Sequence, residues 1–345
     1  MKKASVVILN WNGAEMLRRF LPSVVETSRG REDVEVCVAD NASSDASCEM
    51  VTHEFPSVRL IRLDANYGFA EGYNRALQAV EAEYVVLLNS DVEVTPGWLD
   101  TLLAYMDEHP EVAACQPKLL DYKQKDLFEY AGAAGGFIDR YGYPFCRGRI
   151  FHTIEADRGQ YDTPIEVFWA TGAALLVRLS VYREEGGLDA RFFAHMEEID
   201  FCWRLKSRGY QLMCLPQSVV YHVGGATLKR ENPRKTFLNF RNNLAMLYKN
   251  LPEAELRPVM RVRYFLDYLA ALAFLLKGDR ANAGAILLAR REYKHMRPLL
   301  EADREQNLRY ATTVELSGRF GFSILWQAAV RGRKFYSSLR IRSSM

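Results

Sequence analysis

The feature of the sequence that most constrains its fold is the alternation of short β-branched runs with helical stretches between residues 5 and 88. This alternation is typical of parallel strands that are joined by crossover helices. The predicted strands cover residues 6–9, 34–39, 58–62 and 84–88. The predicted helices between them cover residues 14–26, 46–54 and 69–82. The sequence therefore predicts an α/β domain with a mostly parallel central sheet.

The rest of the chain first extends this domain and then changes character. After a short helix at 98–107, residues 118–164 are rich in Gly, Tyr and charge and predict excursion loops. Further strands are predicted at 167–170, 173–177, 211–215 and 219–222, with a helix at 197–208 between them. The core of the domain is expected to close near Gly225. From residue 232 onward the pattern predicts only helices with basic faces, at 235–251, 261–276 and 282–296. We therefore divide the chain into an α/β domain at 1–230 and a basic helical extension at 231–345.

Charge distinguishes the extension from the domain, because residues 231–345 contain 21 Lys and Arg against 10 Asp and Glu. A basic region of this kind indicates contact with an anionic partner. Its most apolar run, residues 264–276, is shorter than the roughly 20 residues of a membrane span. Two interpretations remain open: a helix that lies in a membrane interface together with Trp326 and the basic tail from Arg331, or a helical cap with a solvated basic face. We expect no nucleic-acid partner, because no recognition motif accompanies the charge.

Cysteine usage and the N-terminus bear on location. The six cysteines are scattered without a Cys-x-x-Cys pair, which favours reduced thiols in a cytosol. The first apolar run, residues 6–9, is too short for the core of a signal peptide. We therefore expect a cytoplasmic protein, either free or peripheral on the cytoplasmic face of the inner membrane.

Polar residues follow three of the predicted strands at the point where each strand ends. These segments are Asn10-Trp11-Asn12-Gly13, Asp40-Asn41-Ala42-Ser43-Ser44-Asp45 and Asn89-Ser90-Asp91. In open parallel sheets ligands bind beyond the carboxyl ends of the strands, so these segments should converge on one crevice. The sequence contains neither a G-x-G-x-x-G fingerprint after its first strand nor a P-loop, so a bound pyrophosphate would be held by a metal ion rather than by a glycine cradle.

Asp91 and His222 are the residues that could hold such an ion. Each follows a predicted buried strand, and together with a diphosphate they would supply oxygen and imidazole ligands to Mn²⁺ or Mg²⁺. Taken singly, Asp91 could instead cap its strand in an Asx turn, and His222 could be a hydrogen-bonded structural histidine.

Three acids, Glu197, Glu198 and Asp200, stand at the start of the helix predicted at 197–208. The helix dipole stabilises acids in a first turn, so one or two of them need no further explanation. Crowded carboxyl groups raise one another's pKa, which prepares one of them to accept a proton near neutral pH.

Six motifs, spread over about residues 4 to 230, resemble those of inverting family 2 glycosyltransferases of the GT-A fold, and their style is closest to bacterial rhamnosyltransferases. They are SVVILNWNG (5–13), VADNASSD (38–45), NYGFAEGYNRAL (66–77), LLNSDVEV (87–94), WATGAALLVR (169–178) and GGLDARFFAHMEEIDFCWRLKSRGY (186–210). Any one of them is a weak signal, whereas six in this order and spacing are specific. The resemblance implies a GT-A nucleotide-diphospho-sugar transferase fold for the first domain.

The resemblance also implies roles for individual residues. Asp40 would bind the base of the donor nucleotide, with Trp11 and Asn74 nearby. The alternatives are a strand cap for Asp40, a core aromatic for Trp11 and a helix-surface amide for Asn74. Asp91 matches the last acid of the family's Asp-x-Asp metal motif, Asn89 stands in place of the first acid, and His222 matches a histidine that completes the metal site in some relatives. Glu198 stands where the family usually has a catalytic Asp, and we take it as the base, with Glu197 and Asp200 as further candidates that would otherwise position the helix or the acceptor. The residues expected to line the sugar site are Trp169 and Gly172, although Trp169 could equally be buried packing.

The predicted activity is an inverting transfer of a hexosyl or rhamnosyl group from a UDP- or dTDP-sugar to a hydroxyl of a glycan or lipid-linked glycan in bacterial surface polysaccharide synthesis. In this hypothesis Glu198 removes the acceptor proton and the divalent metal offsets charge on the departing diphosphate. The alternative is a non-catalytic nucleotide-sugar or glycan-binding subunit of an assembly complex, which would need Asp40 but neither Asp91 nor Glu198.

Overall fold

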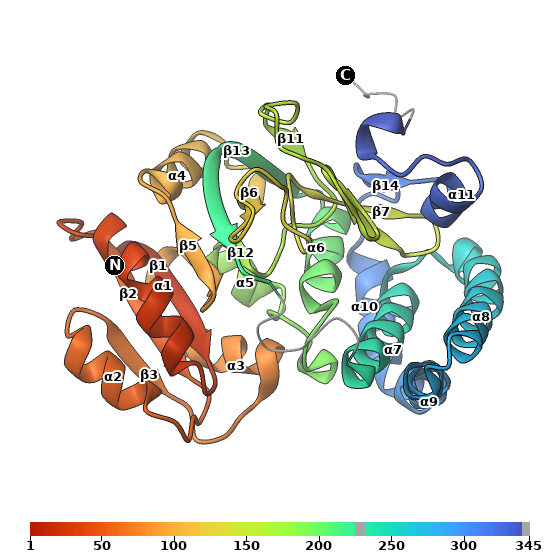
Figure 1. The fold of residues 1–345 in the computed structure, drawn as a ribbon, viewed down its shortest axis with the longest axis horizontal. Coiled ribbons are helices and arrows are strands. Elements are labelled where there is room, and N and C mark those ends of the chain that lie inside the picture. Colours follow the sequence, from red (N-terminus) through yellow and green to blue (C-terminus); the bar gives the residue numbers. More distant parts are fainter. Residues whose placement is uncertain (225–231, 340–345) are drawn as a thin grey trace.

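The computed structural model describes residues 1–224 and 232–339, and within them the chain folds around two β-sheets (Figure 1). The larger sheet contains β1 (Lys2–Asn10), β2 (Val34–Asp40), β3 (Arg59–Arg62), β4 (Ala82–Asn89), β5 (Val92–Val94), β6 (Val112–Asp121), β11 (Ile165–Glu166), β12 (Ala174–Arg178) and β13 (Gln211–His222). Its order is β11-β13-β6-β12-β4-β1-β2-β3, with β5 paired to β13. The pairs β1–β2, β1–β4, β2–β3 and β6–β13 are parallel, whereas β12 is antiparallel to both of its neighbours.

Helices cover both faces of this sheet. They are α1 (Ala14–Thr27), α2 (Ser47–Glu54), α3 (Gly68–Ala76), α4 (Trp98–Glu108), α5 (Leu179–Glu184) and α6 (Glu197–Ser207). Successive side chains of a strand point to opposite faces, so Val6 of β1 joins the core under α1, α2 and α4, whereas Val7 joins the core under α3, α5 and α6. The predicted α/β class with a mostly parallel central sheet is confirmed.

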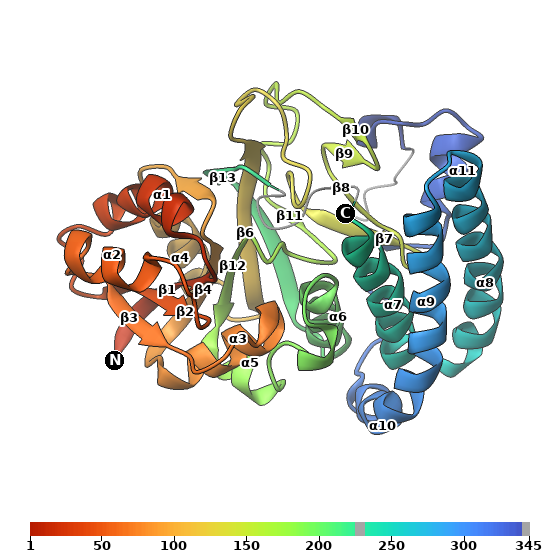
Figure 2. The same cartoon turned by 60° about the horizontal axis from the view of Figure 1, so that its bottom comes forward.

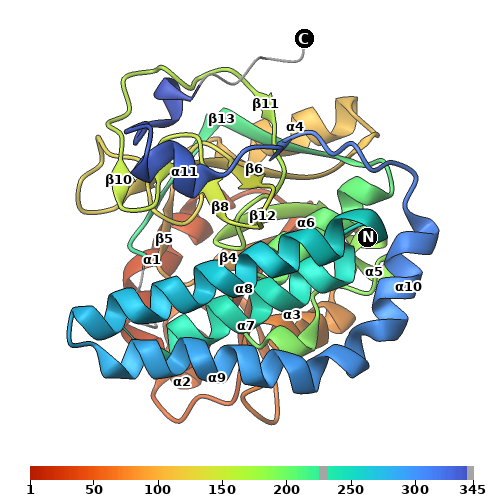
Figure 3. The ribbon, with the colours of Figure 1, turned by 90° about the vertical axis from the view of Figure 1, so that its right-hand side faces the viewer.

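Helices dominate the C-terminal part of the chain, as predicted. They are α7 (Pro233–Asn250), α8 (Glu253–Leu276), α9 (Arg280–Met296), α10 (Glu301–Tyr310) and α11 (Ile324–Ala329). Figures 2 and 3 show α7, α8 and α9 side by side on the flank of the molecule away from β3. Within the described ranges, no helix is both long enough and apolar enough to span a bilayer.

The smaller sheet corrects two predictions. It contains β7 (Gly136–Asp139), β8 (Pro144–Cys146), β9 (Arg149–Ile150), β10 (Thr153–Ile154) and β14 (Arg319–Phe320), in the order β10-β9-β8-β7-β14. Residues 118–164 are therefore not only loops, and the C-terminal part is not purely helical. The C-terminal strand β14 pairs in parallel with β7, which ties the end of the chain to the excursion after β6.

Three further predictions about elements were wrong. The apolar run 167–170 is not a strand, because only Trp169 bridges Gly136 there. The separate strands predicted at 211–215 and 219–222 form one strand, β13, with a register shift between Leu215 and Val219. The third helix ends at Ala76 rather than at residue 82, and a 3₁₀ turn follows it. The predicted closure near Gly225 lies outside the described residues.

Candidate active site

The carboxyl ends of β1 and β2 lie together because the two strands pair with Asn10 opposite Asp40. Asn10 Nδ2 donates a hydrogen bond to Asp40 Oδ1 at 3.1 Å, and the Ser43 backbone N–H donates to Asp40 Oδ2 at 2.9 Å. Both bonds hold the buried Asp40 carboxylate in one orientation. Trp11, the residue after β1, has 51% of its surface exposed.

Asp40 borders a pocket of about 540 Å³ beyond the ends of β2 and β3. Its polar lining residues are Asp40, Ser43, Asp45, Glu49, Thr52, His53 and Arg62. Among the described residues that line this pocket, only Asp40 belongs to the predicted site. The wall offers hydrogen-bond donors and acceptors of both charges, which suits a polar heterocycle.

Asp91 and His222 meet because β5, which directly follows Asp91, pairs antiparallel with β13 and places Val92 opposite His222. His222 Nε2 lies 3.1 Å from Asp91 Oδ1, and Asn89 Nδ2 lies 3.4 Å from the same ring nitrogen. Asp91 and His222 are both buried. The structure thus brings together Asp91 and His222, which we predicted as metal ligands, and Asn89, which stands in place of the first acid of the metal motif.

Glu129, which sequence reasoning missed, contacts the other side of the His222 ring. Its Oε1 lies 3.3 Å from His222 Nδ1, and its Oε2 accepts a hydrogen bond from the Ala131 backbone N–H. Burial alone would lower the pKa of His222, but the carboxylates of Glu129 and Asp91 raise it to about 10. Glu129 stands in the segment that we predicted as excursion loops, where no periodicity marks a residue as buried.

A divalent cation fits the residues that meet here once it takes the place of the proton that the raised pKa keeps on the His222 ring. A carboxylate oxygen and an imidazole nitrogen face each other, and a second carboxylate on Nδ1 is the usual arrangement that orients a metal-binding histidine. The described residues contain no cluster of three His, Cys, Asp or Glu side chains that could hold an ion. Further ligands would therefore come from substrate phosphates and water, as is common for Mg²⁺.

Glu197 and Glu198 occupy the first turn of α6, and each has a buried Oε2 without a hydrogen-bond partner. Burial raises the pKa of Glu198 to about 7. Burial and the neighbouring Glu198 carboxyl raise the pKa of Glu197 well above its usual range. A carboxyl group whose pKa lies near 7 can exchange a proton at neutral pH.

Glu198 lies close to the carboxyl end of β4. The Asn89 backbone N–H donates to Ala173 O at 3.0 Å, which places the 171–173 segment beside the end of that strand. A methyl group built on the neighbouring Gly172 would lie 3.7 Å from Glu198 Cβ and 3.3 Å from the Phe69 ring. Gly172 therefore lies beside Glu198.

The loop before α6 has an unusual backbone. Phe193, His195 and Met196 have φ values of 65°, 71° and 73°, which are sterically costly for residues other than glycine. Asn242 Nδ2 of α7 donates to the carbonyl oxygens of Phe192, Ala194 and His195 at 2.9, 2.9 and 2.8 Å. The side-chain amide of Asn242 in the helical extension thus holds the strained loop that positions Glu197 and Glu198.

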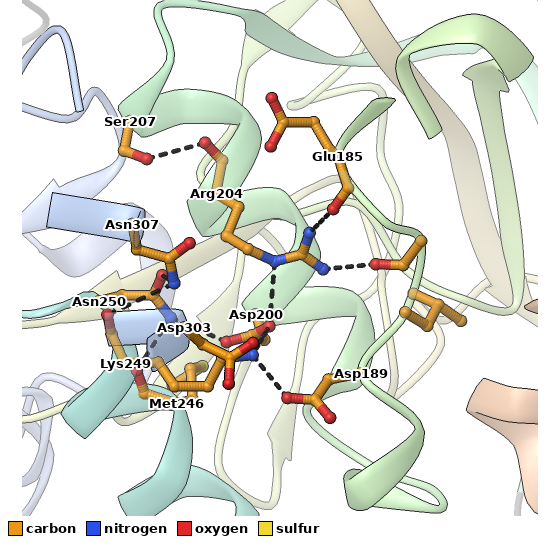
Figure 4. Close-up of polar contacts among 12 residues, drawn as sticks. Glu185, Asp189, Asp200, Arg204, Ser207, Met246, Lys249, Asn250, Asp303 and Asn307 are labelled. Atoms are coloured by element: carbon orange, nitrogen blue, oxygen red, sulfur yellow. Dashed lines mark hydrogen bonds and ion pairs between the residues drawn. The ribbon is translucent and has the colours of Figure 1, made fainter. Parts of the chain in front are cut away.

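Asp200, predicted to contact substrate, lies instead inside a buried polar network between α6, α7 and α10 (Figure 4). Its Oδ2 accepts from Lys249 Nζ at 2.7 Å and from Arg204 Nε at 3.2 Å, and its Oδ1 accepts from Asn250 Nδ2 at 2.8 Å. Lys249 also pairs with Asp189 at 2.7 Å. With no exposed surface and both oxygens bonded, Asp200 is placed to hold α6 against α7 rather than to contact a substrate.

Two other predicted residues also occupy structural positions. Asn74, expected near the nucleotide, donates to Leu188 O at 2.7 Å and accepts from Tyr182 Oη at 2.7 Å, so its amide joins α3 to the segment after α5. Trp169, expected at the sugar site, is buried and donates from Nε1 to Phe137 O at 2.9 Å. Both side chains satisfy their polar groups within the protein.

Comparison with known proteins now adds to this geometry. Residues 5–174 match the model of glycosyl transferase family 2. An N-acetylglucosaminyl-diphospho-decaprenol L-rhamnosyltransferase of Mycobacterium tuberculosis is 30% identical over 236 residues, which cover 63% of this chain and 75% of the relative. A pre-mycofactocin glycosyltransferase of the same species is 28% identical over 244 residues, which cover 68% of this chain and 46% of the relative.

Solved structures support the fold. GalNAc-T7 with UDP, GalNAc and Mn²⁺ superposes with a TM-score of 0.62 at 15% identity, over 96% of this chain and 57% of that one. The Pyrobaculum calidifontis mannosyltransferase PcManGT with GDP-Man and Mn²⁺ gives a TM-score of 0.51 at 16% identity, over 89% and 87% of the two chains. Together with the sheet topology, these similarities confirm the GT-A fold. The chain belongs to glycosyl transferase family 2 and is a glycosyltransferase.

Proposed function

We propose that this glycosyltransferase inverts the configuration of the transferred sugar and acts in bacterial surface polysaccharide synthesis. It requires a divalent metal, and Glu198 is its catalytic base. The transferred group is a hexosyl or rhamnosyl residue, the donor is a UDP- or dTDP-sugar, and the acceptor is a hydroxyl of a glycan or lipid-linked glycan. The M. tuberculosis relative is named for rhamnosyl transfer to a diphospho-decaprenol sugar, which supports a lipid-linked acceptor here.

The observation that carries the proposal is the state of the Glu198 carboxyl group. Its Oε2 is buried without a protein partner, its pKa is raised to about 7 by burial, and it adjoins Gly172 near the carboxyl end of β4. A structural carboxylate would be paired, as Asp200 is. An unpaired one with this pKa is suited to take a proton from an acceptor hydroxyl.

In the proposed reaction Glu198 Oε2 removes the proton of the acceptor hydroxyl. That oxygen then attacks the anomeric carbon from the face opposite the leaving nucleoside diphosphate, and the bond from the anomeric carbon to the diphosphate breaks. A divalent cation bound by Asp91 and His222 would supply the Lewis acid that offsets charge on the leaving diphosphate. Glu129 would hold the His222 ring in place, and Asp40 would bind the base of the donor.

Screening UDP-, dTDP- and GDP-sugars with Mn²⁺, with and without extracted lipid acceptors, tests this function. The proposal predicts that one donor is consumed only when an acceptor is present, and that NMR shows an inverted anomeric configuration in the product. Activity should disappear with EDTA and return with Mn²⁺ or Mg²⁺. Donor consumption without an acceptor, or a product of retained configuration, would contradict the proposal.

A further inference from the structure

The helix α8 presents apolar side chains to solvent along its C-terminal half. Soluble helices normally bury their apolar stripe and expose their polar one. The exposed side chains of α8 are Tyr264, Phe265, Tyr268, Leu269, Leu272, Leu275 and Leu276, which recur at the three- and four-residue spacing of one helix face. Phe265 has 66% of its surface exposed and Leu276 has 79%. We call this set the outer face of α8.

The buried face of the same helix carries charge. Asp267 has no exposed surface and accepts hydrogen bonds from Arg263, at 3.1 Å, and from Arg290 of α9, at 2.5 Å. Arg263 also donates to Tyr141 O at 2.9 Å. Turning α8 about its axis so that the apolar stripe faced the core would break these buried ion pairs, which is costly. The outer face is therefore fixed outward.

Basic side chains frame the outer face. Arg261 and Arg257 lie exposed on α8 about one and two turns before Phe265. Lys277 and Arg280 are exposed where α8 gives way to α9. Figure 3 shows α8 and α9 alongside each other on one flank, and α9 adds exposed Leu287 and Leu288 together with exposed Arg291 and Lys294. Aromatic and aliphatic side chains bordered by Lys and Arg are the composition of helices that lie in a membrane interface.

A second copy of the chain fits this surface less well than a lipid bilayer does. Both ends of the outer face are basic, so pairing two such faces in either direction would place like charges opposite each other. An anionic lipid surface instead attracts the basic frame while its acyl region receives the apolar side chains.

We propose that the outer face of α8 docks on an anionic lipid bilayer, with the helix lying in the plane of the interface. The inference rests on the proposed function in one respect: the docked enzyme would reach a lipid-linked acceptor while that acceptor stays anchored in the bilayer. Of the two interpretations that the sequence left open, it develops the interfacial helix, and it assigns the main membrane contact to α8 rather than to the basic tail.

Flotation of the full chain with phosphatidylglycerol-containing and phosphatidylcholine-only vesicles tests this surface. The triple variant F265S/L269S/L272S removes exposed apolar groups only, so its melting temperature should match that of the unaltered chain. We expect the unaltered chain to float with the anionic vesicles and the variant to lose binding at least about tenfold. The matched control Y310S/V314S removes exposed apolar groups of α10 and the loop after it and should float normally.

Three outcomes would overturn the inference: flotation of the triple variant at the level of the unaltered chain, absence of flotation of the unaltered chain, or a dimer by light scattering that the triple variant converts to a monomer. Sugar transfer to a water-soluble acceptor separates this inference from the proposed function. A chain that floats but transfers no sugar contradicts the function alone, whereas a chain that transfers sugar but does not float contradicts the docking surface alone.

Discussion

The first turn of α6 contains two adjacent carboxyl groups, those of Glu197 and Glu198, whose ionisation is disfavoured by burial and by mutual repulsion. Both Glu197 and Glu198 lose solvation on folding, and ionising both would place like charges side by side in a poorly solvated position. Burial raises the pKa of both groups, and the neighbouring Glu198 carboxyl raises that of Glu197 as well. Glu198 is the one of the two that adjoins Gly172 near the end of β4, which supports it as the base.

The pKa of Glu198 predicts how activity depends on pH. A general base works deprotonated, so kcat/KM should be at its plateau above a pKa of about 7 and fall about tenfold per pH unit below it. Initial rates between about pH 5.5 and 8.5 test this, with circular dichroism at each pH as the control for folding. A flat profile across that range would mean that Glu198 does not gate the reaction.

The sequence predicted some residues of this site and missed others for a physical reason. Asp91, His222 and Asp40 stand at the ends of strands, and strand ends in parallel sheets meet at one edge. The local sequence pattern was therefore enough to predict that these residues lie at the site. Asn242 and Glu129 act through contacts with segments far away along the chain, and neither stands in a pattern that distinguishes it from a surface residue. Asn74, Trp169 and Asp200 looked like site residues in their motifs, but their partners make them structural.

At the scale of elements, α6 depends on α7 for its position. Lys249 is buried and neutralises both Asp189 and Asp200, which flank the strained loop on either side. Lys249→Met removes the cation that the two carboxylates share and leaves each with one arginine, Arg191 on Asp189 and Arg204 on Asp200. We therefore expect a loss of about 1 to 3 kcal/mol in the free energy of unfolding, measured by urea denaturation. Lys294→Met on the exposed face of α9 is the matched control and should change stability by less than about 0.5 kcal/mol. Equal stability of the two variants would contradict the role given to Lys249.

Asn242 links the same helix to catalysis. Asn242→Ala removes three hydrogen bonds to the strained loop, so the loop can relax and carry Glu198 away from the acceptor. We expect kcat to fall by about 10- to 100-fold while the KM for the donor changes little, because Asp40 is untouched. Asn239→Ala is the control, since Asn239 Nδ2 donates to Lys235 O of the same helix. A variant with altered donor KM and normal kcat would contradict this positioning role.

Sequence reasoning missed β6, which lies between β13 and β12 in the larger sheet. Its run includes Gln116, Pro117 and Lys118, which by themselves argue against a buried strand. The fold satisfies them individually: Gln116 Oε1 accepts from the Thr171 N–H at 2.9 Å, and Lys118 Nζ pairs with Asp157 at 2.6 Å. Tertiary partners of this kind are invisible in a local pattern.

At the scale of the whole molecule, the helical extension and the first domain share one core. Leu244 and Leu247 of α7 belong to the same buried cluster as Val85 of β4 and Phe201 of α6. The strand β14 completes the small sheet from the far end of the chain. The extension therefore packs as a part of the catalytic unit, whatever surface it also offers to a membrane.

This shared core predicts that a chain truncated after residue 230 will not fold on its own. Truncation would expose the apolar cluster at α7 and leave Asp200 buried without Lys249, so we expect aggregation or loss of a cooperative thermal transition. A chain that ends at residue 339 is the control and should melt like the full chain. A cooperative transition of the 1–230 fragment at the same temperature would show instead that the division predicted from the sequence marks two independent domains.

The measurement that tests the central claim most directly is the single-turnover rate of sugar transfer by Glu198→Gln, compared with Glu197→Gln and the unaltered chain. Our account predicts a loss of about 10² to 10⁴ for Glu198→Gln, with an unchanged melting temperature and unchanged donor binding, and a much smaller effect for Glu197→Gln. A Glu198→Gln enzyme that transfers sugar at a near-normal rate would contradict the account.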